Sequence, residues 1–424
     1  MASLTLRIAP ATVALAAAVL LASPTVAGAQ ARAIPADHAG VRQAVEMLRA
    51  DNAWTLEQQV AVCEIPAPPF MEQRRAEDYV QRLRAAGIDS VRIDTEGNVI
   101  GERPGTGDGP LVVISAHLDT VFPEETDVTV RMEGDVMHGP GIGDDCRGLA
   151  VVLAVARAMN EHNVQTEGTI LFVGTVGEEG PGNLRGVRHL FETELAGQVD
   201  YFISVDGTGL NITHAAVGSH RYRVTYSGPG GHSYGAFGMP NPIHAVGRAI
   251  AKFAELQVPR EPRTTFSVGV IQGGTSVNSI AFEASFDVDM RSEQREPLDA
   301  MDARFRELVQ EALEEERARW PNSQRGLEVT IDTIGIRPAG AQPEDAPIVL
   351  TAINAGAALG FEPRLGPSST DSNIPISLGI PAITIDGGGQ GRGAHALDEM
   401  YRDGPEGWKG PQWALLIVAA LAGV

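Results

Sequence analysis

The chain contains 424 residues, a length that favours two domains, and 43% of them are hydrophobic, which is enough to build a large buried core. The formal net charge is −21 and no cluster of lysine or arginine stands out. The composition therefore argues against nucleic acids and anionic membrane surfaces as partners.

The N-terminal segment has the features of a secretory signal peptide. Arg7 supplies a short basic region, residues 11–21 form an apolar stretch, and Ala27-Gly28-Ala29 fits a small-x-small cleavage site. Because the apolar stretch is short for a membrane span, a cleaved signal peptide over residues 1–29 is favoured over a retained anchor. We therefore expect an exported protein, periplasmic or secreted, with no membrane span in the mature chain.

The two cysteines, Cys63 and Cys146, leave their oxidation state open. An exported protein could join them in one disulfide. Their different sequence contexts are at least as compatible with two separate buried thiols.

The first half of the mature chain alternates helices and strands. Helical spacing of apolar residues predicts helices over residues 39–52, 74–86 and 149–162. Continuous apolar runs predict strands buried on both faces over residues 111–120, 168–176 and 200–205. Weaker patterns predict strands or hairpins over residues 91–100 and 127–137. This order indicates an α/β fold with a mixed, mostly parallel central sheet flanked by helices.

Polar side chains follow each of the three buried strands. His117 and Asp119 end the first strand, Glu178 and Glu179 follow the second, and Asp206 follows the third. The carboxyl ends of parallel strands meet at one edge of a sheet, where open α/β sheets bind their ligands. The alternatives are a capped turn at His117 and a solvated acidic turn at the two glutamates.

Two further aspartates precede the helix predicted over residues 149–162. Helix N-capping accounts for Asp145, because aspartate is favoured at that position. Asp144 follows a glycine-rich segment, which suggests that the backbone comes close to another group there.

The pattern changes at about Thr213. Alternating strands are predicted over residues 221–226, 264–271, 281–291 and 327–334, with helices over residues 242–256 and 298–317. The resulting order β-α-β-β-α-β is that of a ferredoxin-like sandwich. We interpret residues 214–335 as an α+β domain inserted between two parts of the first domain, residues 30–213 and 336–424.

The last part of the chain resumes the first domain. It is predicted to contain a helix over residues 348–359, a polar loop over 365–372, a strand over 381–385 and a terminal helix over 411–424. His395 follows this last strand and is a further ligand candidate. Two imidazoles and several carboxylates without a thiolate cluster suit zinc, cobalt or manganese in a hydrolytic site.

Six motifs in this order, HLDTV, GIGDDCRG, GTVGEEG, SVDG, GGHS and GAHALDE, resemble those of a dizinc metallopeptidase family. That family includes peptidase T, carboxypeptidase G, acetylornithine deacetylase, succinyl-diaminopimelate desuccinylase and aminoacylase. The resemblance covers nearly the whole mature chain. It implies a zinc exopeptidase-like fold with an inserted lid and dimerisation domain, and two Zn²⁺ ions, with Co²⁺ or Mn²⁺ possible.

The resemblance also implies a role for the motif residues. Metal ligands are implied at His117, Asp144, Glu179, Asp206 and His395, with Asp144 bridging the two ions. Glu178 would be the general base that activates water, and Asp119 would orient His117.

The inserted domain is implied to act on the substrate and to form a homodimer. His232 would stabilise the oxyanion, reaching the partner subunit's active site in dimeric members. Arg291 and Asn278 would hold the carboxylate end and the backbone of the substrate. The alternatives are a turn histidine at His232 and a surface ion pair of Arg291 with Asp289 or Asp287.

Three functions remain open at this point. Asp206, rather than Glu at this position, and the GTVGEEG motif resemble the peptidase T branch more than the carboxypeptidase branch and favour an exopeptidase acting on short peptides. Cys146 and Arg147 depart from the lysine that many relatives carry there. An N-acyl amino acid amidohydrolase is the second function. A non-catalytic peptide-binding protein on the same scaffold is the third, and the retention of Glu178 argues against it.

Overall fold

A mixed sheet is the centre of the structure. The computed structural model describes residues 30–321, 323 and 326–424, so the predicted signal peptide over residues 1–29 lies outside the described residues. In that described part of the chain the sheet has nine strands. In spatial order they are β1 (Ser90–Ile93), β2 (Val99–Arg103), β6 (Ile170–Thr175), β3 (Val112–His117), β7 (Tyr201–Val205), β17 (Ala382–Ile385), β8 (Ile212–Ala216) and β15 (Gly340–Ala341), with β16 (Leu365–Ser368) beside β8.

The four strands in the middle of this sheet, β6, β3, β7 and β17, are parallel to one another, whereas their outer neighbours β2 and β8 pair antiparallel to β6 and β17. All residues of β3 and β6 are buried, as the continuous apolar runs predict. Successive side chains of a strand point to opposite faces. Val112 and Ile114 accordingly pack into one core, and Val113 packs into the other. The predicted fold class is therefore confirmed, and the carboxyl ends of these strands share one edge.

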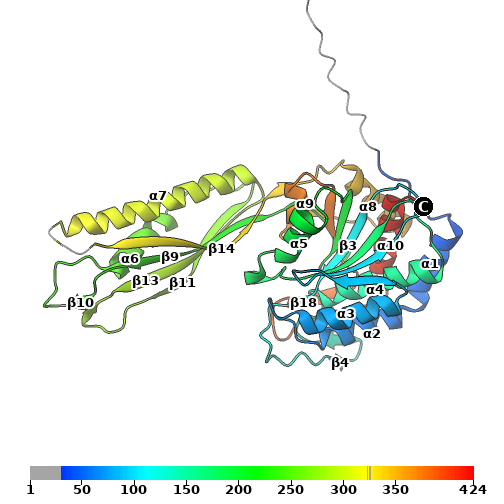
Figure 1. Ribbon diagram of the computed structural model, residues 1–424, viewed down its shortest axis with the longest axis horizontal. Helices are drawn as coiled ribbons and strands as arrows, with labels where there is room; N and C mark the ends of the chain where they lie inside the picture. Colours follow the sequence, from blue (N-terminus) through cyan, green and yellow to red (C-terminus); the bar gives the residue numbers. More distant parts are fainter. Residues whose placement is uncertain (1–29, 322, 324–325) are drawn as a thin grey trace, which may run out of the picture. The chain divides into compact units, whose positions relative to one another are not determined.

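Helices cover both faces of the sheet (Figure 1). On one face the core contains side chains of α1 (Ala39–Ala50), α2 (Asn52–Cys63), α3 (Gln73–Ala85), α4 (Cys146–Glu161), α8 (Pro347–Ala358) and α10 (Lys409–Ala422). On the other face it contains side chains of α5 (Arg185–His189), the π-helical segment η2 (Leu190–Glu194) and α9 (Asn373–Ser377). No helix of the described residues is long and apolar enough to cross a membrane.

A small antiparallel sheet brings two distant loops together. Its strands lie in the order β18 (Gln390–Arg392), β19 (Met400–Arg402), β5 (Val136–His138) and β4 (Arg131–Glu133). Because β19 pairs with β5, the loop that carries His395 lies against the loop that carries Asp144.

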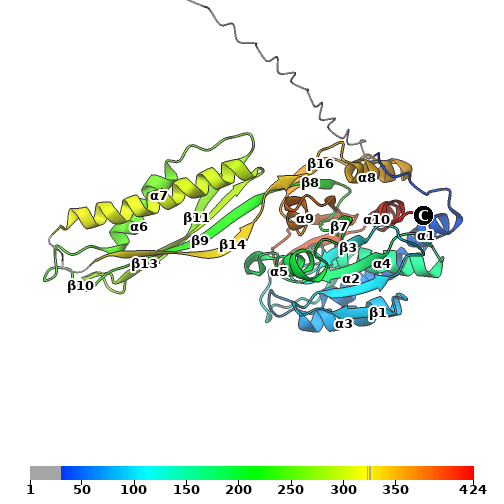
Figure 2. The same cartoon turned by 45° about the horizontal axis from the view of Figure 1, so that its top comes forward.

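The segment between β8 and β15 forms a second, antiparallel sheet with two helices (Figure 2). The chain order is β9 (Gly218–Ser227), α6 (Pro242–Ala254), β11 (Thr264–Gly273), β13 (Glu283–Ser292), α7 (Arg295–Arg319) and β14 (Glu328–Arg337), and the spatial order of the strands is β11-β13-β9-β14. The β-α-β-β-α-β prediction is confirmed, and we call this segment the insert. The exact domain boundaries stay predictions: β14 continues to Arg337, beyond the predicted end at residue 335.

Two of the differences from the sequence prediction concern β16 and α2. The polar loop predicted over residues 365–372 begins with β16, a short strand at the side of the sheet whose glycine and proline hide its pattern. Helix α2 was not predicted, and its last residue, Cys63, forms a disulfide with Cys146 at the start of α4. Of the two alternatives for the cysteines, the structure therefore has the disulfide.

Candidate metal centre and active site

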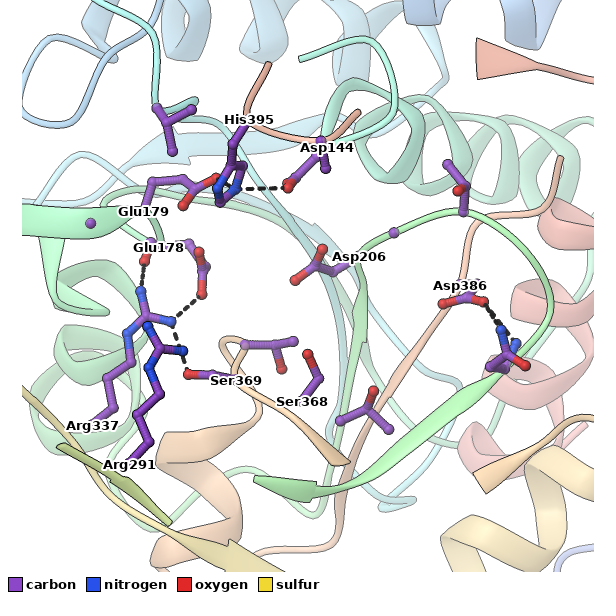
Figure 3. Close-up of a pocket in the computed structure, with 18 of the residues that line it drawn as sticks. Asp144, Glu178, Glu179, Asp206, Arg291, Arg337, Ser368, Ser369, Asp386 and His395 are labelled. Carbon is purple, nitrogen blue, oxygen red and sulfur yellow. Dashed lines mark hydrogen bonds and ion pairs between the residues drawn. The ribbon is translucent and has the colours of Figure 1, made fainter. Parts of the chain in front are cut away.

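The residues predicted as metal ligands meet at the carboxyl edge of the central sheet. Figure 3 shows Asp144, Glu179, Asp206 and His395, and His117 lies beside Asp144. His117 is the last residue of β3, Asp206 follows β7 directly, and Glu179 lies in the loop after β6. Asp144 precedes α4, whereas His395 comes from the loop between β18 and β19. The sheet therefore supplies three of these side chains, and two loops held by the small antiparallel sheet supply the others.

Asp144 lies between the two histidines. Its Oδ1 is 3.0 Å from Nε2 of His117, and its Oδ2 is 3.2 Å from Nε2 of His395. The same nitrogen of His395 is 2.9 Å from Oε1 of Glu179. A carboxylate with one oxygen facing each of two imidazoles has the geometry of a bridging ligand between two metal ions.

The crowded acids make this edge suited to cations. Burial raises the pKa of Asp206 to about 7, and the hydrogen bonds to Asp144 and Glu179 raise the pKa of His395 to about 10. Potential ligand atoms of His117, Asp144 and Glu179 all lie within 4.8 Å of one another. Because zinc binds imidazole nitrogen and carboxylate oxygen, the donor set fits it.

Asp145 forms a second compact group with His117 and Asp206. Its carboxylate is already occupied, since Oδ1 accepts from the backbone N of Gly148 and Oδ2 accepts from the backbone N of His117, each at 3.0 Å. The first of these bonds is the N-cap of α4 that the sequence predicts. We therefore assign the Asp145 carboxylate to backbone hydrogen bonds, and the role of Asp206 as a metal ligand stays a prediction.

Asp119 positions both His117 and the glutamate pair. Its carbonyl oxygen is 2.9 Å from Nδ1 of His117, whereas its carboxylate Oδ1 is 3.7 Å from that nitrogen. The carboxylate instead accepts hydrogen bonds from the backbone N of Glu178 at 3.0 Å and of Glu179 at 2.8 Å. Asp119 thus contacts His117 mainly through its main chain and fixes the turn after β6 through its side chain.

Glu399 holds the loop that carries Asp144, a contact that the sequence analysis missed. Its carboxylate accepts three backbone hydrogen bonds, from Gly141 at 2.8 Å, Gly143 at 2.8 Å and Asp144 at 3.0 Å. The available signal was its position in the GAHALDE motif, four residues after His395.

A cavity of about 690 Å³ opens beside the metal-ligand cluster. Its lining combines the acids of the cluster with three arginines, Arg221, Arg291 and Arg337, and with hydroxyl groups of the loop 368–370. Arg291 donates through Nε to Asp289 at 2.8 Å, so its terminal nitrogens are not used by that ion pair. Arg291 therefore forms the predicted ion pair and also lines the cavity, whereas its role in substrate binding stays a prediction.

Arg337 was not predicted as a site residue. It donates through Nη1 to Oε1 of Glu178 at 2.8 Å and to Oγ of Ser369 at 3.1 Å, and through Nη2 to the carbonyl oxygen of Glu178. Burial raises the pKa of Glu178 well above its usual range, and the charge of Arg337 opposes that rise.

His232 and Asn278 do not line this cavity. They lie at the small pairing of β10 (Gly231–His232) with β12 (Ser279–Ile280) in the insert. His232 is exposed, and its Nδ1 accepts from the backbone N of Tyr234 at 3.2 Å and of Gly235 at 3.3 Å. Within one chain the cavity is thus built without them.

The fold and this cluster define a hydrolase of the metallopeptidase or amidohydrolase class. The model of Peptidase family M20/M25/M40 matches residues 113–406, more than half of the chain. The chain belongs to this family. The resemblance to a metallopeptidase family is thus confirmed.

Individual relatives are distant. Carboxypeptidase G2 of Pseudomonas sp. (strain RS-16) is 28% identical over 316 residues, 72% of this chain and 71% of that protein. The uncharacterized protein YqjE of Bacillus subtilis is 25% identical over 346 residues, 78% of this chain and 89% of that protein. The crystal structure of aminopeptidase PepT from Bacillus cereus covers 87% of this chain and 98% of its own with a TM-score of 0.70 at 21% identity, which shows the fold.

Proposed function

We propose that the protein cleaves amide bonds of short peptides as an exopeptidase that uses two zinc ions. The observation that carries this proposal is the position of the Asp144 carboxylate, with one oxygen toward His117 and the other toward His395. The structure of YXEP from Bacillus subtilis, described as a dinuclear metal binding peptidase of the M20 family, supports it at a TM-score of 0.64 and 18% identity.

Each metal ion would be held by the bridging carboxylate of Asp144 and by two further side chains. His117 and Asp206 would complete one site, and Glu179 and His395 the other. Cobalt or manganese suits the same oxygen and nitrogen donors. When bound, the ions supply Lewis acidity, which polarises a carbonyl group and lowers the pKa of water.

Glu178 is the proposed general base. Its carboxylate lies on the wall of the cavity beside the ligand cluster, and Arg337 holds only one of its two oxygens by a hydrogen bond. The other oxygen can therefore take a proton from the attacking water and pass it to the leaving amine. Asp119 keeps this carboxylate in place through the backbone N of Glu178.

Groups of the insert are proposed to bind the rest of the substrate. The terminal nitrogens of Arg291 are suited to the carboxylate end of a peptide, because a guanidinium binds a carboxylate with two parallel hydrogen bonds. Asn278 and His232 do not reach the cavity of their own chain, so their proposed roles require the cavity of a second subunit. The exposed edge strand β11, with Val270 and Ile271 on its surface, offers a place for two copies to pair.

The disulfide between Cys63 and Cys146 is consistent with the proposed export, because disulfides persist in oxidising compartments.

An N-acyl amino acid amidohydrolase is the second candidate function. The relatives N-acetylcysteine deacetylase of Bacillus subtilis, 25% identical over 266 residues, and succinyl-diaminopimelate desuccinylase of Bordetella petrii, 30% identical over 218 residues, favour it.

One assay separates the two functions. The zinc-loaded protein is incubated with di- and tripeptides and, in parallel, with acetyl- and succinyl-amino acids, and the released amines are quantified. We expect the highest kcat/KM for the peptides. A preference for the acylated amino acids would instead support an N-acyl amino acid amidohydrolase. Binding without any turnover would favour a non-catalytic peptide-binding protein.

A further inference from the structure

Asp386 is a carboxylate of the cavity that has no part in the proposed metal binding or base catalysis. It directly follows Ile385, the last residue of β17, and lines the same cavity as Glu178 and Asp206. It is half-buried, and burial raises its pKa to about 6. A partly buried acid needs a partner, so its two oxygens decide what it can do.

Only one oxygen of Asp386 is used within the chain. Oδ2 accepts from the backbone N of Asn211 at 2.9 Å and from Nδ2 of Asn211 at 2.7 Å. Oδ1 accepts no hydrogen bond from the described residues and is not among their fully buried, unpartnered atoms. It therefore remains accessible in the cavity as a free acceptor with negative charge.

The loop after β7 makes room for this carboxylate. Gly207 and Gly209 both have positive φ, and a Cβ at Gly209 would lie 2.7 Å from Oδ2 of Asp386. Hydrogen bonds from the backbone N of Asp386 to Asn211 and from Gly388 to Gly209 join this loop to the end of β17. Because the same loop begins at Asp206, Asp386 is held in a fixed relation to a proposed metal ligand.

Charged side chains of opposite sign lie on opposite sides of the cavity. Figure 3 shows Arg291 and Arg337 on one side and Asp386 on the other, with Asp206 between them. A substrate whose scissile carbonyl lies at the cluster would therefore have a cationic wall on one side and a free carboxylate on the other. Apart from Asp386, the polar groups near that second wall are neutral: Thr208, Asn211 and Thr213.

We propose that Asp386 is a specificity-determining residue that binds a primary ammonium group of the substrate through Oδ1. This inference rests on the proposed amide hydrolysis and names its substrate class: short peptides with an ammonium group on one side of the scissile bond and a carboxylate on the other. The ammonium group can be the α-amine of a peptide or the amine of a lysine-type side chain. Asn211 is a positioning residue, since it fixes the orientation of the Asp386 carboxylate.

The competing explanation is that Asp386 only holds the turn over residues 207–211. The variant Asp386→Asn separates the two, because an amide oxygen can still accept from Asn211 while the negative charge is lost. Two substrate pairs identify the source of the ammonium group. Ala-Ala and N-acetyl-Ala-Ala differ at the α-amine, and N-acetyl-lysyl-alanine and N-acetyl-norleucyl-alanine differ at the side chain on the acyl side of the scissile bond.

The measured quantity is the selectivity of the zinc-loaded protein, defined as kcat/KM for the charged member of a pair divided by kcat/KM for the neutral member. We expect Asp386→Asn to reduce this selectivity about 10- to 100-fold for one of the two pairs, the range of a lost hydrogen bond to a charged group. The value for the neutral member should stay unchanged. Calorimetric Kd values of the same four compounds provide the same ratio without turnover.

The control is Asp135→Asn, which removes an equal charge from an exposed ion pair with Arg402 and should change neither ratio. If Asp386→Asn folds poorly, Asp386→Ser fits the same space and is tested in its place. An equal loss for both members of each pair, or no loss, would overturn the inference and leave Asp386 as a turn residue. Failure of the proposed function gives a different result, because the wild-type protein would then hydrolyse none of the four compounds. In that case the ratios of the Kd values test whether Asp386 binds the ammonium group.

Discussion

Arg337 and Glu178 form a buried ion pair, with Nη1 of the arginine 2.8 Å from Oε1 of the glutamate. Arg337 is the last residue of β14 in the insert, and Glu178 lies in the loop after β6 of the central sheet. The cation that restrains the proposed base therefore comes from the segment of the chain that also supplies Arg291.

The variant Arg337→Met should destabilise the protein and slow turnover. Removing one partner of a buried ion pair leaves an uncompensated charge and costs about 3–5 kcal/mol. Without the guanidinium the pKa of Glu178 rises further, so less of the base is ionised. Chemical denaturation measures the loss of stability, and kcat of the zinc-loaded variant measures the slower turnover.

Arg402→Met, which breaks an exposed pair with Asp135, is the matched control and should change stability by about 1 kcal/mol or less. Equal stabilities of the two variants would contradict the prediction.

Glu178→Gln should keep the metal and lose the reaction. The amide can retain the hydrogen bond from Arg337 but cannot take a proton, and a general base contributes roughly 10²–10⁴ in rate. Metal content by atomic emission and kcat under saturating substrate test this. Loss of metal together with substantial residual turnover would mean that Glu178 and Glu179 have exchanged roles.

Removal of divalent metal should abolish turnover, and zinc or cobalt should restore it. The five oxygen and nitrogen side chains at the sheet edge motivate this expectation. The protein is dialysed against a chelator, assayed, and titrated with each ion. The melting temperature should fall on removal and recover on titration, because binding to the folded state stabilises it. Undiminished turnover of the metal-free protein would rule out the metal-dependent mechanism.

Glu399→Gln should weaken metal binding, although Glu399 is not a proposed ligand. Its carboxylate accepts three backbone hydrogen bonds from the Gly141–Asp144 loop, and side chains that orient ligands typically change metal affinity 10–100-fold. Asp398→Asn, at the exposed neighbouring residue, removes the same charge without these bonds and is the control. The readout is the zinc Kd by competition with a chromophoric chelator, and equal Kd values for both variants would refute the positioning role.

His232→Ala should lower kcat on the order of 10²–10³, as loss of an oxyanion donor does, while the metal content stays constant. Because His232 does not line the cavity of its own chain, the effect should arise across a dimer. Mixed refolding of inactive His232→Ala and Glu178→Gln chains should then regenerate activity, since one cavity of the hybrid has both groups intact. Failure of the mixture to gain activity, or full activity of a stable monomer, would exclude the trans arrangement.

Sequence periodicity was sufficient for the core of the fold and for the ligands that end strands. The apolar runs before His117 and Asp206 are unbroken. The parallel sheet could therefore be predicted, and so could the candidate ligands at its carboxyl edge. Asp386 also follows a buried strand, but three glycines come directly after it, and an aspartate before glycines is typical of a turn.

Residues that act through long-range contacts could not be predicted in this way. Arg337 is the last residue of an alternating strand, and its sequence pattern predicts only an arginine at a sheet edge. Its contact with Glu178 depends on the position of β14 beside the loop after β6, which the pattern does not give. Glu399 and Arg147 are similar cases. Arg147, at the place where many relatives carry lysine, is fully buried and donates to the carbonyl oxygens of Gly387 and Gly407, which ties α4 to the end of the chain.

The distribution of the ligands along the chain has a consequence for biosynthesis. His117, Asp144, Glu179 and Asp206 are synthesised long before His395, and α10, whose residues are all buried in the core, follows later still. A ribosome-bound nascent chain therefore holds four of the five proposed ligands but neither the last imidazole nor helix α10. If these residues hold the metal as proposed, the chain acquires hydrolytic competence only after elongation has passed through α10.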